Sequence, residues 1–178
     1  MTAERPIRTR RVYQGRVVAL RVDEVVLPSG RVTEREVVEH RGAVGIIPVT
    51  AQGDVLLVRQ FRAAIGRELL EIPAGTVEPG EGLEACVQRE LAEEVGMRAG
   101  HLEPLLSFFP SPGFLTEEVH LYLASDLSPH RLRGEEEDLT VVRVSLQDAR
   151  ALVSTGEIVD GKSIIGIILA EERIGRAT

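Results

Sequence analysis

Three glutamates near the middle of the chain, Glu90, Glu93 and Glu94, stand at positions i, i+3 and i+4, with Arg89 beside them. In a helix this spacing places the three carboxylates on one face. Like charges at such spacing destabilise a helix unless a cation sits among them. Carboxylate oxygens are the ligands that Mg²⁺ and Mn²⁺ prefer. The pattern therefore indicates a metal-assisted reaction, although a solvated acidic face is the usual meaning of such glutamates taken alone.

A helix over residues 81–95 is predicted to carry these glutamates. The segment contains no proline, and Gly96 supplies a C-terminal stop. Apolar residues recur every four positions and form one stripe for the core, at Leu83, Val87, Leu91 and Val95. The carboxylates lie on a different face, where they are available for chemistry.

The residues around this helix resemble the signature of the Nudix family over 23 positions. Every fixed position of that signature is matched, by Gly75, Glu81, Arg89, Glu90, Leu91, Glu93, Glu94, Gly96 and Met97. The resemblance implies an α/β fold of the α+β type, the Nudix α/β/α sandwich with a mixed sheet, over residues 41–178. It also implies hydrolysis of a nucleoside diphosphate linked to another moiety.

The resemblance assigns metal-binding roles to three glutamates of the signature and to Ala74 just before it. Glu90 and Glu94 are expected to bind Mg²⁺ or Mn²⁺ directly, Glu93 directly or through water, and the carbonyl of Ala74 to add a ligand. More than one ion is expected in the substrate complex. Metal ions offset the charge by which a pyrophosphate repels a nucleophile.

Four further positions of the signature are expected to shape the site. Glu81 is expected to brace the loop or Arg89 rather than bind metal. Arg89 is expected to orient the glutamates through charge-assisted hydrogen bonds. Gly75 and Gly96 are structural.

Three short segments resemble the ADP-ribose pyrophosphatase group, two of them outside the signature and one leading into it. They are Glu71-Ile72-Pro73-Ala74-Gly75, Arg59-Gln60-Phe61-Arg62, and Ser111-Pro112-Gly113-Phe114, whose proline lies sixteen residues beyond Gly96. The residues expected to bind substrate are therefore Arg59, Arg62, Glu71, Pro112, Gly113 and Phe114. Arg62 is expected to contact a phosphate, whereas Arg59 is as well explained by a surface charge at a strand end.

An acidic run at residues 135–138 precedes a predicted strand. The same group places a glutamate in a loop here, proposed as catalytic base or metal-site group, and the alignment favours Glu136, then Glu137. A solvated loop is the alternative.

Residues 1–40 are expected to form a separate antiparallel sheet. β-Branched residues are frequent over residues 12–27 and 32–39, and Pro28-Ser29-Gly30 between them is a turn signal. Such a small sheet needs a partner surface, and the resemblance implies a homodimer that completes each active site. The chain has no tryptophan, so stacking on the adenine base would fall to Tyr13, to Phe61 or to an aliphatic and arginine clamp.

Strands and helices interleave in residues 41–178. Strands are expected at 42–49, 54–61, 69–74, 102–109, 118–124 and 139–144, and helices at 146–155 and 163–174. The segment 127–137 is expected to be irregular.

The composition and charge of the chain argue against some classes of function and some cellular locations. The 178 residues are 43% hydrophobic with a formal charge of −7, which argues against binding to nucleic acid or to an anionic membrane. No run of apolar residues is long enough for a membrane span or a signal peptide, so the cytoplasm is expected. The single cysteine, Cys86, is expected to be a small buried apolar residue.

Alternative functions stay open at this point. The chain could hydrolyse a different nucleoside diphosphate compound, such as a GDP-sugar, FAD or a dinucleotide. A hydrolase of oxidised nucleoside triphosphates is less expected, because those chains are usually shorter. A non-catalytic ADP-ribose sensor is the alternative from outside the enzymes.

Overall fold

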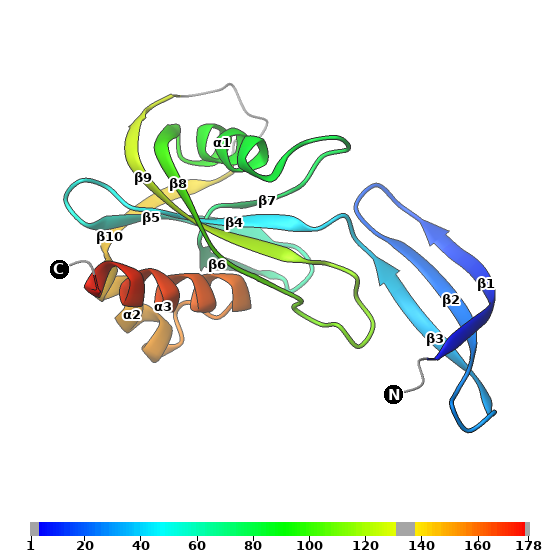
Figure 1. The fold of residues 1–178 in the computed structure, drawn as a ribbon. Coiled ribbons are helices and arrows are strands. Elements are labelled where there is room, and N and C mark those ends of the chain that lie inside the picture. Colours follow the sequence, from blue (N-terminus) through cyan, green and yellow to red (C-terminus); the bar gives the residue numbers. More distant parts are fainter. Residues whose placement is uncertain (1–3, 131–137, 177–178) are drawn as a thin grey trace. The chain divides into compact units, whose positions relative to one another are not determined.

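The computed structural model describes residues 4–130 and 138–176 of the chain (Figure 1). The described residues divide into two units by their contacts, one of residues 4–42 and 108–118, and one of residues 43–107, 119–130 and 138–176. The sequence places the division at residues 40 and 41 and leaves 108–118 with the larger part. In the structure this segment instead makes its contacts with the N-terminal strands.

The smaller unit is built on a three-stranded antiparallel sheet in the order β1-β2-β3, formed by β1 (Arg5–Gln14), β2 (Ala19–Val26) and β3 (Val32–Glu39). The predicted turn is confirmed, since Gly30 has φ +82° and its amide donates to the carbonyl of Leu27 at 2.9 Å. The β-rich stretch over residues 12–27 is two strands rather than one. A turn closed by a bond from the Gly15 amide to the Val18 carbonyl at 2.9 Å separates them.

The segment from Phe108 to Glu118 joins this sheet through backbone hydrogen bonds. The amide of Val38 donates to the carbonyl of Phe114 at 2.7 Å, and the amide of Thr116 donates to the carbonyl of Val38 at 3.0 Å. A parallel bridge between Val38 and Leu115 results.

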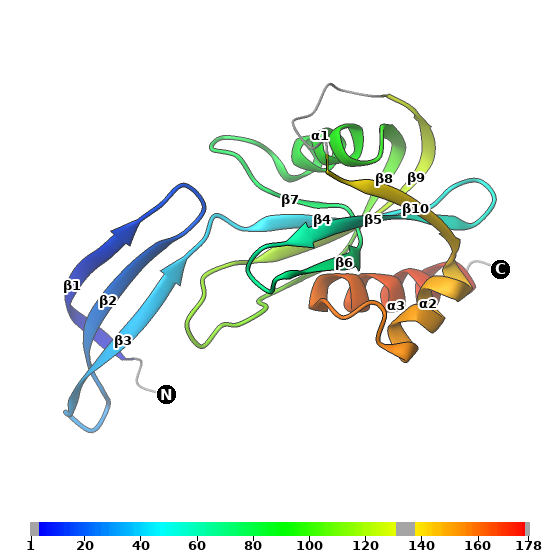
Figure 2. The ribbon, with the colours of Figure 1, turned by 180° about the vertical axis from the view of Figure 1, so that it is seen from behind.

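The larger unit is an α/β/α sandwich, as predicted. One sheet is mixed, in the order β7-β4-β9-β8, and the other is antiparallel, in the order β10-β5-β6. Helix α1 covers one face, and α2 and α3 cover the other (Figures 1 and 2). The bounds are β4 (Ala43–Pro48), β5 (Asp54–Arg62), β6 (Arg67–Glu71), β7 (Ala74–Thr76), α1 (Leu83–Glu94), β8 (Met97–Phe108), β9 (Val119–Pro129), β10 (Thr140–Ser145), α2 (Leu146–Thr155) and α3 (Gly161–Gly175).

Strand β4 lies at the centre of this unit and runs parallel to β9. Its residues are buried on both faces, as expected for a strand covered by helices on both sides. Val44 and Ile46 belong to the core cluster that packs α1. On the other face α3 lies so close that a Cβ at Gly166 would be 2.9 Å from Ile47 Cδ1.

Helix α1 confirms the predicted helix and its apolar stripe. Val87 and Leu91 are fully buried and Val95 is nearly so. The helix begins at Leu83 rather than at residue 81, because the preceding turn contains Gly80 with φ +80° and Gly82 caps the helix without a side chain. Gly96 adopts a left-handed φ of +68° and ends it as predicted.

The predicted strand over residues 69–74 is wrong in one respect. It is two strands in different sheets, since β6 ends at Glu71 and β7 begins at Ala74. Pro73 has no N–H to give to a ladder, and its carbonyl accepts from the amide of Ile46 at 2.9 Å. The chain passes from one sheet to the other at this point.

Several boundaries also differ from the expected ones. Strand β8 begins directly after α1 at Met97, and β9 extends to Pro129, into the segment expected to be irregular. Helix α3 begins at Gly161 because Asp160 caps it, accepting from the amide of Ser163 at 3.1 Å. Within the described residues no helix is long and apolar enough to cross a membrane.

Candidate active site

The C-terminal half of α1 carries the predicted metal ligands, and two of them are buried. Glu90 is 7% exposed and Glu94 is 6% exposed, whereas the Glu93 side chain is 31% exposed. A buried carboxylate costs free energy unless it is paired or hydrogen-bonded. The partners of these side chains therefore define the site.

Arg89 is the cation that binds Glu90 and Glu93, together with Glu81. Its guanidinium binds Glu81 through two bonds, from Nε to Oε1 at 2.8 Å and from Nη2 to Oε2 at 2.9 Å. Its Nη1 lies 2.6 Å from Glu90 Oε1 and 3.1 Å from Glu93 Oε2. Nη2 also donates to the carbonyl of Thr76 at 3.2 Å. All three guanidinium nitrogens therefore have partners inside the protein, and Arg89 acts here to hold carboxylates.

The charges in this group are fixed by their mutual hydrogen bonds. The bonds from Arg89 lower the pKa of Glu81 to about 2, and the same bonds raise the pKa of Arg89. Both groups are charged at neutral pH. Burial raises the pKa of the neighbouring Cys86 thiol to about 12. Cys86 is thus a neutral buried residue, as predicted.

The short strand β7 lies against two of the carboxylates. The backbone amide of Ala74 donates to Glu94 Oε2 at 3.0 Å. A Cβ atom at Gly75 would lie 1.7 Å from Glu90 Oε1, which is far inside the contact distance of non-bonded atoms. Glycine at position 75 therefore allows the backbone to approach the Glu90 carboxylate.

The chemistry of these donors fits a hard divalent cation. Over residues 4–130 and 138–176, no three His, Cys, Asp or Glu side chains are gathered closely enough to hold a metal ion as they stand. The carboxylates of Glu90 and Glu93 face Arg89, and that of Glu94 faces the Ala74 amide. Together with Glu81, the carboxylates of Glu90 and Glu93 bring three negative charges to the Arg89 guanidinium. Carboxylate oxygen is the donor that Mg²⁺ and Mn²⁺ prefer, so the residues fit such an ion.

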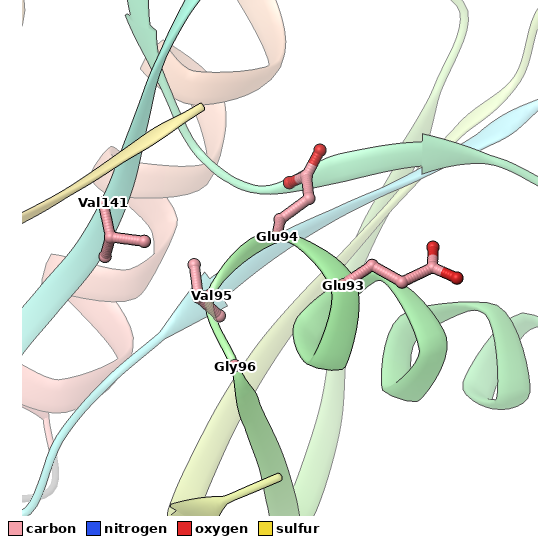
Figure 3. A pocket seen from close by; sticks show the side chains of 5 residues that line it. All are labelled: Glu93, Glu94, Val95, Gly96 and Val141. Carbon is pink, nitrogen blue, oxygen red and sulfur yellow. The ribbon is translucent and has the colours of Figure 1, made fainter. Parts of the chain in front are cut away.

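A hollow of about 250 Å³ opens beside the C-terminal end of α1. The side chains of Glu93 and Glu94 leave the last turn of the helix in different directions (Figure 3). The hollow is lined by Glu93, Glu94, Val95, Gly96 and Val141. Val141 on β10 was not identified from the sequence. The volume is near the lower end of small-molecule sites, roughly 300 Å³.

A second set of charged side chains lies at the end of β5, the end of β6 and the start of α3. Arg62 binds Glu71 through two bonds, from Nε to Oε1 at 2.9 Å and from Nη2 to Oε2 at 2.7 Å. The ammonium of Lys162 also donates to Glu71, and to Asp160 Oδ1 at 2.8 Å. The two predicted substrate-binding residues Arg62 and Glu71 are thus paired with each other.

Glu71 stays ionised in this set although it is only 1% exposed. Burial alone would raise the pKa of Glu71, but hydrogen bonds from Arg62 and the positive charge of Lys162 outweigh it and hold the pKa below its ordinary value. Sequence reasoning missed Lys162 and Asp160, because the contact between Lys162 and Glu71 joins positions 91 residues apart.

Comparison with protein families decides the family of this chain. A model of the NUDIX domain matches residues 39–164, and a model of the nucleoside diphosphate sugar hydrolase N-terminal domain matches residues 4–38. The chain belongs to the Nudix family. The predicted family is confirmed, and the N-terminal strands match a family model of their own.

Individual Nudix relatives cover most of the chain. An ADP-ribose pyrophosphatase of Bacillus subtilis (strain 168) is 41% identical over 92% of this chain and 90% of its own. A methanol dehydrogenase activator of Bacillus methanolicus is 38% identical over the same shares. A solved structure described as an ADP compounds hydrolase is 23% identical, with a TM-score of 0.90 over 99% of this chain and 97% of its own. That likeness confirms the Nudix fold.

The remaining predicted residues belong to other segments of the chain than α1. Arg59 forms a surface ion pair with Glu157, in which Arg59 Nη2 lies 3.6 Å from Glu157 Oε1. Pro112, Gly113 and Phe114 lie in the smaller unit, where Phe114 is bonded to Val38 and is 53% exposed. The proposed base residues, Glu136 and Glu137, lie outside the described residues.

Proposed function

We propose that this Nudix hydrolase cleaves the pyrophosphate bond of ADP-ribose to give AMP and ribose 5-phosphate, with Mg²⁺ or Mn²⁺ as cofactor. The observation that carries the proposal is the 41% identity to an ADP-ribose pyrophosphatase over 92% of the chain. The segments around Arg62, Glu71 and Pro112 favour the same substrate, because they resemble that group independently of the Nudix signature.

The ligands of the metal ions would come from α1 and β7. Glu90 and Glu94 would bind directly, Glu93 directly or through water, and Ala74 through its carbonyl, with more than one ion in the substrate complex. Bound there, the ions would neutralise the diphosphate and acidify a water molecule. Arg89 would keep the glutamates in place through the pairs it already makes.

Other residues would bind the substrate and move the proton. Arg62 would donate to a phosphate oxygen, and Arg59 and residues 112–114 would contact the rest of the molecule. Glu136, or else Glu137, would accept the proton of the attacking water. Hydrolysis joins that water oxygen to one phosphorus and leaves the bridging oxygen on the other phosphate.

The smaller unit would complete the site as part of a homodimer. Every residue of β1, an outer strand of its sheet, is exposed, and the apolar side chains of Ile7, Val12 and Tyr13 are each about half exposed. Open strand edges invite pairing, and two-fold dimers are the commonest assembly. Residues 1–42 contain nine arginines and six acidic residues, a charge of +3 in a chain of −7. The basic sheet thus complements the acidic remainder of a second copy.

The proposal includes a cellular compartment and a partner for the enzyme. The enzyme would work in the cytoplasm on a soluble nucleoside diphosphate sugar, with a second copy of itself as its partner. No binding to nucleic acid or to membranes is expected, because the net charge of −7 repels both.

Product analysis over a panel of substrates tests the proposed reaction. Purified protein with Mg²⁺ or Mn²⁺ would be given ADP-ribose, a GDP-sugar, FAD and a dinucleotide. We expect the highest kcat/KM with ADP-ribose, and AMP with ribose 5-phosphate as products. A higher kcat/KM for another compound would assign that substrate instead, and binding of ADP-ribose without turnover would indicate a sensor.

Removal of residues 1–40 tests the proposed dimer. We expect the truncated chain to be monomeric by sedimentation and to lose ADP-ribose hydrolysis, while circular dichroism still reports folded helices. A folded monomer with unchanged kcat/KM would exclude a role of the sheet in the site.

A further inference from the structure

The sequence contains a single lysine, Lys162, while its other 20 basic residues are arginine. This lysine is largely buried, with 19% of its side chain exposed. Its ammonium lies between the carboxylates of Glu71 and Asp160. Lysine presents a compact charge with three donors, which suits contact with two carboxylates from different elements.

Hydrogen bonds fix the start of α3 and so restrict the position of Lys162. Asp160 Oδ1 accepts from the Ser163 amide at 3.1 Å and caps the helix. The fully buried Ser163 hydroxyl accepts from the amide of Ile72 at 2.9 Å, one residue beyond β6. These bonds hold the Lys162 ammonium beside Glu71 at the end of that strand.

Arg62 is the second cation bound to Glu71, and it shares the Glu71 Oε2 atom with Lys162. Its Nε and Nη2 are used by the two oxygens of Glu71, whereas its Nη1 has no hydrogen-bond partner among the residues that the structure describes. The Arg62 side chain is 37% exposed. Hydrogen bonds to Glu71 raise the pKa of Arg62, and the charge of Glu94 adds to this. Arg62 therefore lies within electrostatic reach of a proposed metal ligand.

The charges of this set balance only when Lys162 is included. Two cations, Arg62 and Lys162, face two carboxylates, Glu71 and Asp160. Without Lys162, Arg62 would be the only cation of the set. The negative charges of both carboxylates would then attract its guanidinium, because a buried carboxylate is costly without a paired cation. The guanidinium would then be less available to an anionic ligand.

We propose that Lys162 is a positioning residue for the substrate phosphate, acting through Glu71 to keep the Nη1 edge of Arg62 free to donate. The inference rests on the proposed phosphate contact of Arg62. It adds a residue from the far end of the sequence that neither contacts the substrate nor binds metal. Its effect is on substrate affinity rather than on the chemical step.

Kinetics of Lys162→Met test this role, because methionine matches the length of the four-carbon lysine stem and lacks the charged ammonium. We expect KM to rise roughly tenfold, as for loss of a charge-assisted hydrogen bond, with kcat and the Mg²⁺ activation constant within about twofold of the wild type. Lys162→Arg restores the charge and is expected to recover most of the affinity. The matched control is Arg173→Met, which removes an exposed cation from the other end of the same helix.

A spectroscopic measurement on the wild-type chain tests the same role without a substitution at Lys162. Incorporation of ¹³Cε-labelled lysine gives one side-chain signal, since the chain has one lysine. We expect this signal to shift when α,β-methylene-ADP-ribose, which cannot be hydrolysed, binds in the presence of Mg²⁺. The shift should be lost in Arg62→Gln at ligand concentrations that saturate that variant.

The outcomes separate this inference from the proposed substrate. If the panel identifies another nucleoside diphosphate compound, that compound and its non-hydrolysable analogue replace ADP-ribose, because the phosphate contact is common to all of them. A raised KM with rescue by arginine and a signal shift that depends on Arg62 support the role. A lowered melting temperature with unchanged KM, or a lysine signal that does not move at saturation, would overturn it and leave Lys162 a structural clamp.

Discussion

Two groups of charged side chains in the larger unit differ in how their charges balance. In the Arg89 cluster (Arg89 with Glu81, Glu90 and Glu93) one guanidinium pairs with three carboxylates. In the Lys162 network (Lys162 and Arg62 with Glu71 and Asp160) two cations pair with two carboxylates.

The difference indicates what each group is built to do. The Lys162 network is neutral as a whole, so we expect it to stabilise the fold without any ligand. The Arg89 cluster keeps an excess of negative charge beside the buried Glu94, and such an excess is costly unless a cation joins it. Substitutions at Glu94 and Glu71 therefore test whether the site beside the Arg89 cluster needs a metal ion and whether the Lys162 network is complete without one.

The largest effect is expected from Glu94→Gln. Glutamine keeps the shape and can still accept from the Ala74 amide, but it removes a proposed metal ligand. We expect kcat to fall on the order of 10³-fold or more at saturating Mg²⁺, with the melting temperature nearly unchanged. Glu84→Gln, an exposed position on the same helix, is the control. Near-normal turnover of Glu94→Gln would remove the assignment of Glu94 to metal.

A smaller loss is expected from Glu136→Gln. The glutamates of α1 are assigned to metal, which leaves room for a base from elsewhere, and a metal-bound hydroxide needs less help from a base. We expect kcat to fall roughly 10²-fold, with KM and metal activation unchanged. Glu137→Gln is the matched comparison. Damage in that variant instead would shift the assignment by one residue, and full activity in both would leave the acidic run a solvated loop.

The smallest effect on turnover but a clear effect on stability is expected from Glu71→Gln. The substitution leaves Lys162 and Arg62 facing an uncharged group, and we expect unfolding to become easier by about 2 kcal/mol at neutral pH, since both cations retain some access to water. Urea unfolding measures the difference. Equal stability of variant and wild type would show that the network does not stabilise the fold.

The pH dependence of that difference has a definite sign. The pKa of Glu71 is lower in the folded chain than its ordinary value of 4.5. Its contribution is therefore fully present above about pH 4.5 and is lost as the pH falls through the folded-state pKa. We expect the gap between wild type and Glu71→Gln to be constant from pH 7 to about pH 5 and to close in stronger acid.

The helix that carries the glutamates was predictable because all its signals are local. The stripe through Val87 and Leu91 repeats every four residues, and Gly96 ends the helix with a positive φ. The Nudix signature places the glutamates in the same window, so one segment of sequence defines most of the proposed metal site. The role of Gly75 follows from the same signature and is explained by the Glu90 carboxylate that lies against it.

The remaining features depend on contacts between distant segments. Lys162 has no local signal, because its partner Glu71 lies 91 residues earlier. The end of β6 was missed because residues 69–74 are continuous as a pattern, while their hydrogen bonds belong to two different sheets. The packing of residues 108–118 on the N-terminal strands is also non-local, since it rests on bonds between Val38 and Phe114 and between Thr116 and Val38.

The passage of the chain between the two sheets has a consequence for the spacing of ligands. Glu71 ends β6 inside the Lys162 network, and Ala74 begins β7 with its amide bonded to Glu94. Three residues joined by covalent bonds span at most about 10 Å, and Pro73 among them has a fixed φ. The backbone itself therefore limits how far the Arg62 end of the site can move from the carboxylate end. A single inserted residue would increase the maximum distance between Glu71 and Ala74 by about 3.5 Å. That increase is enough to separate a phosphate bound by Arg62 from an ion bound by the carboxylates.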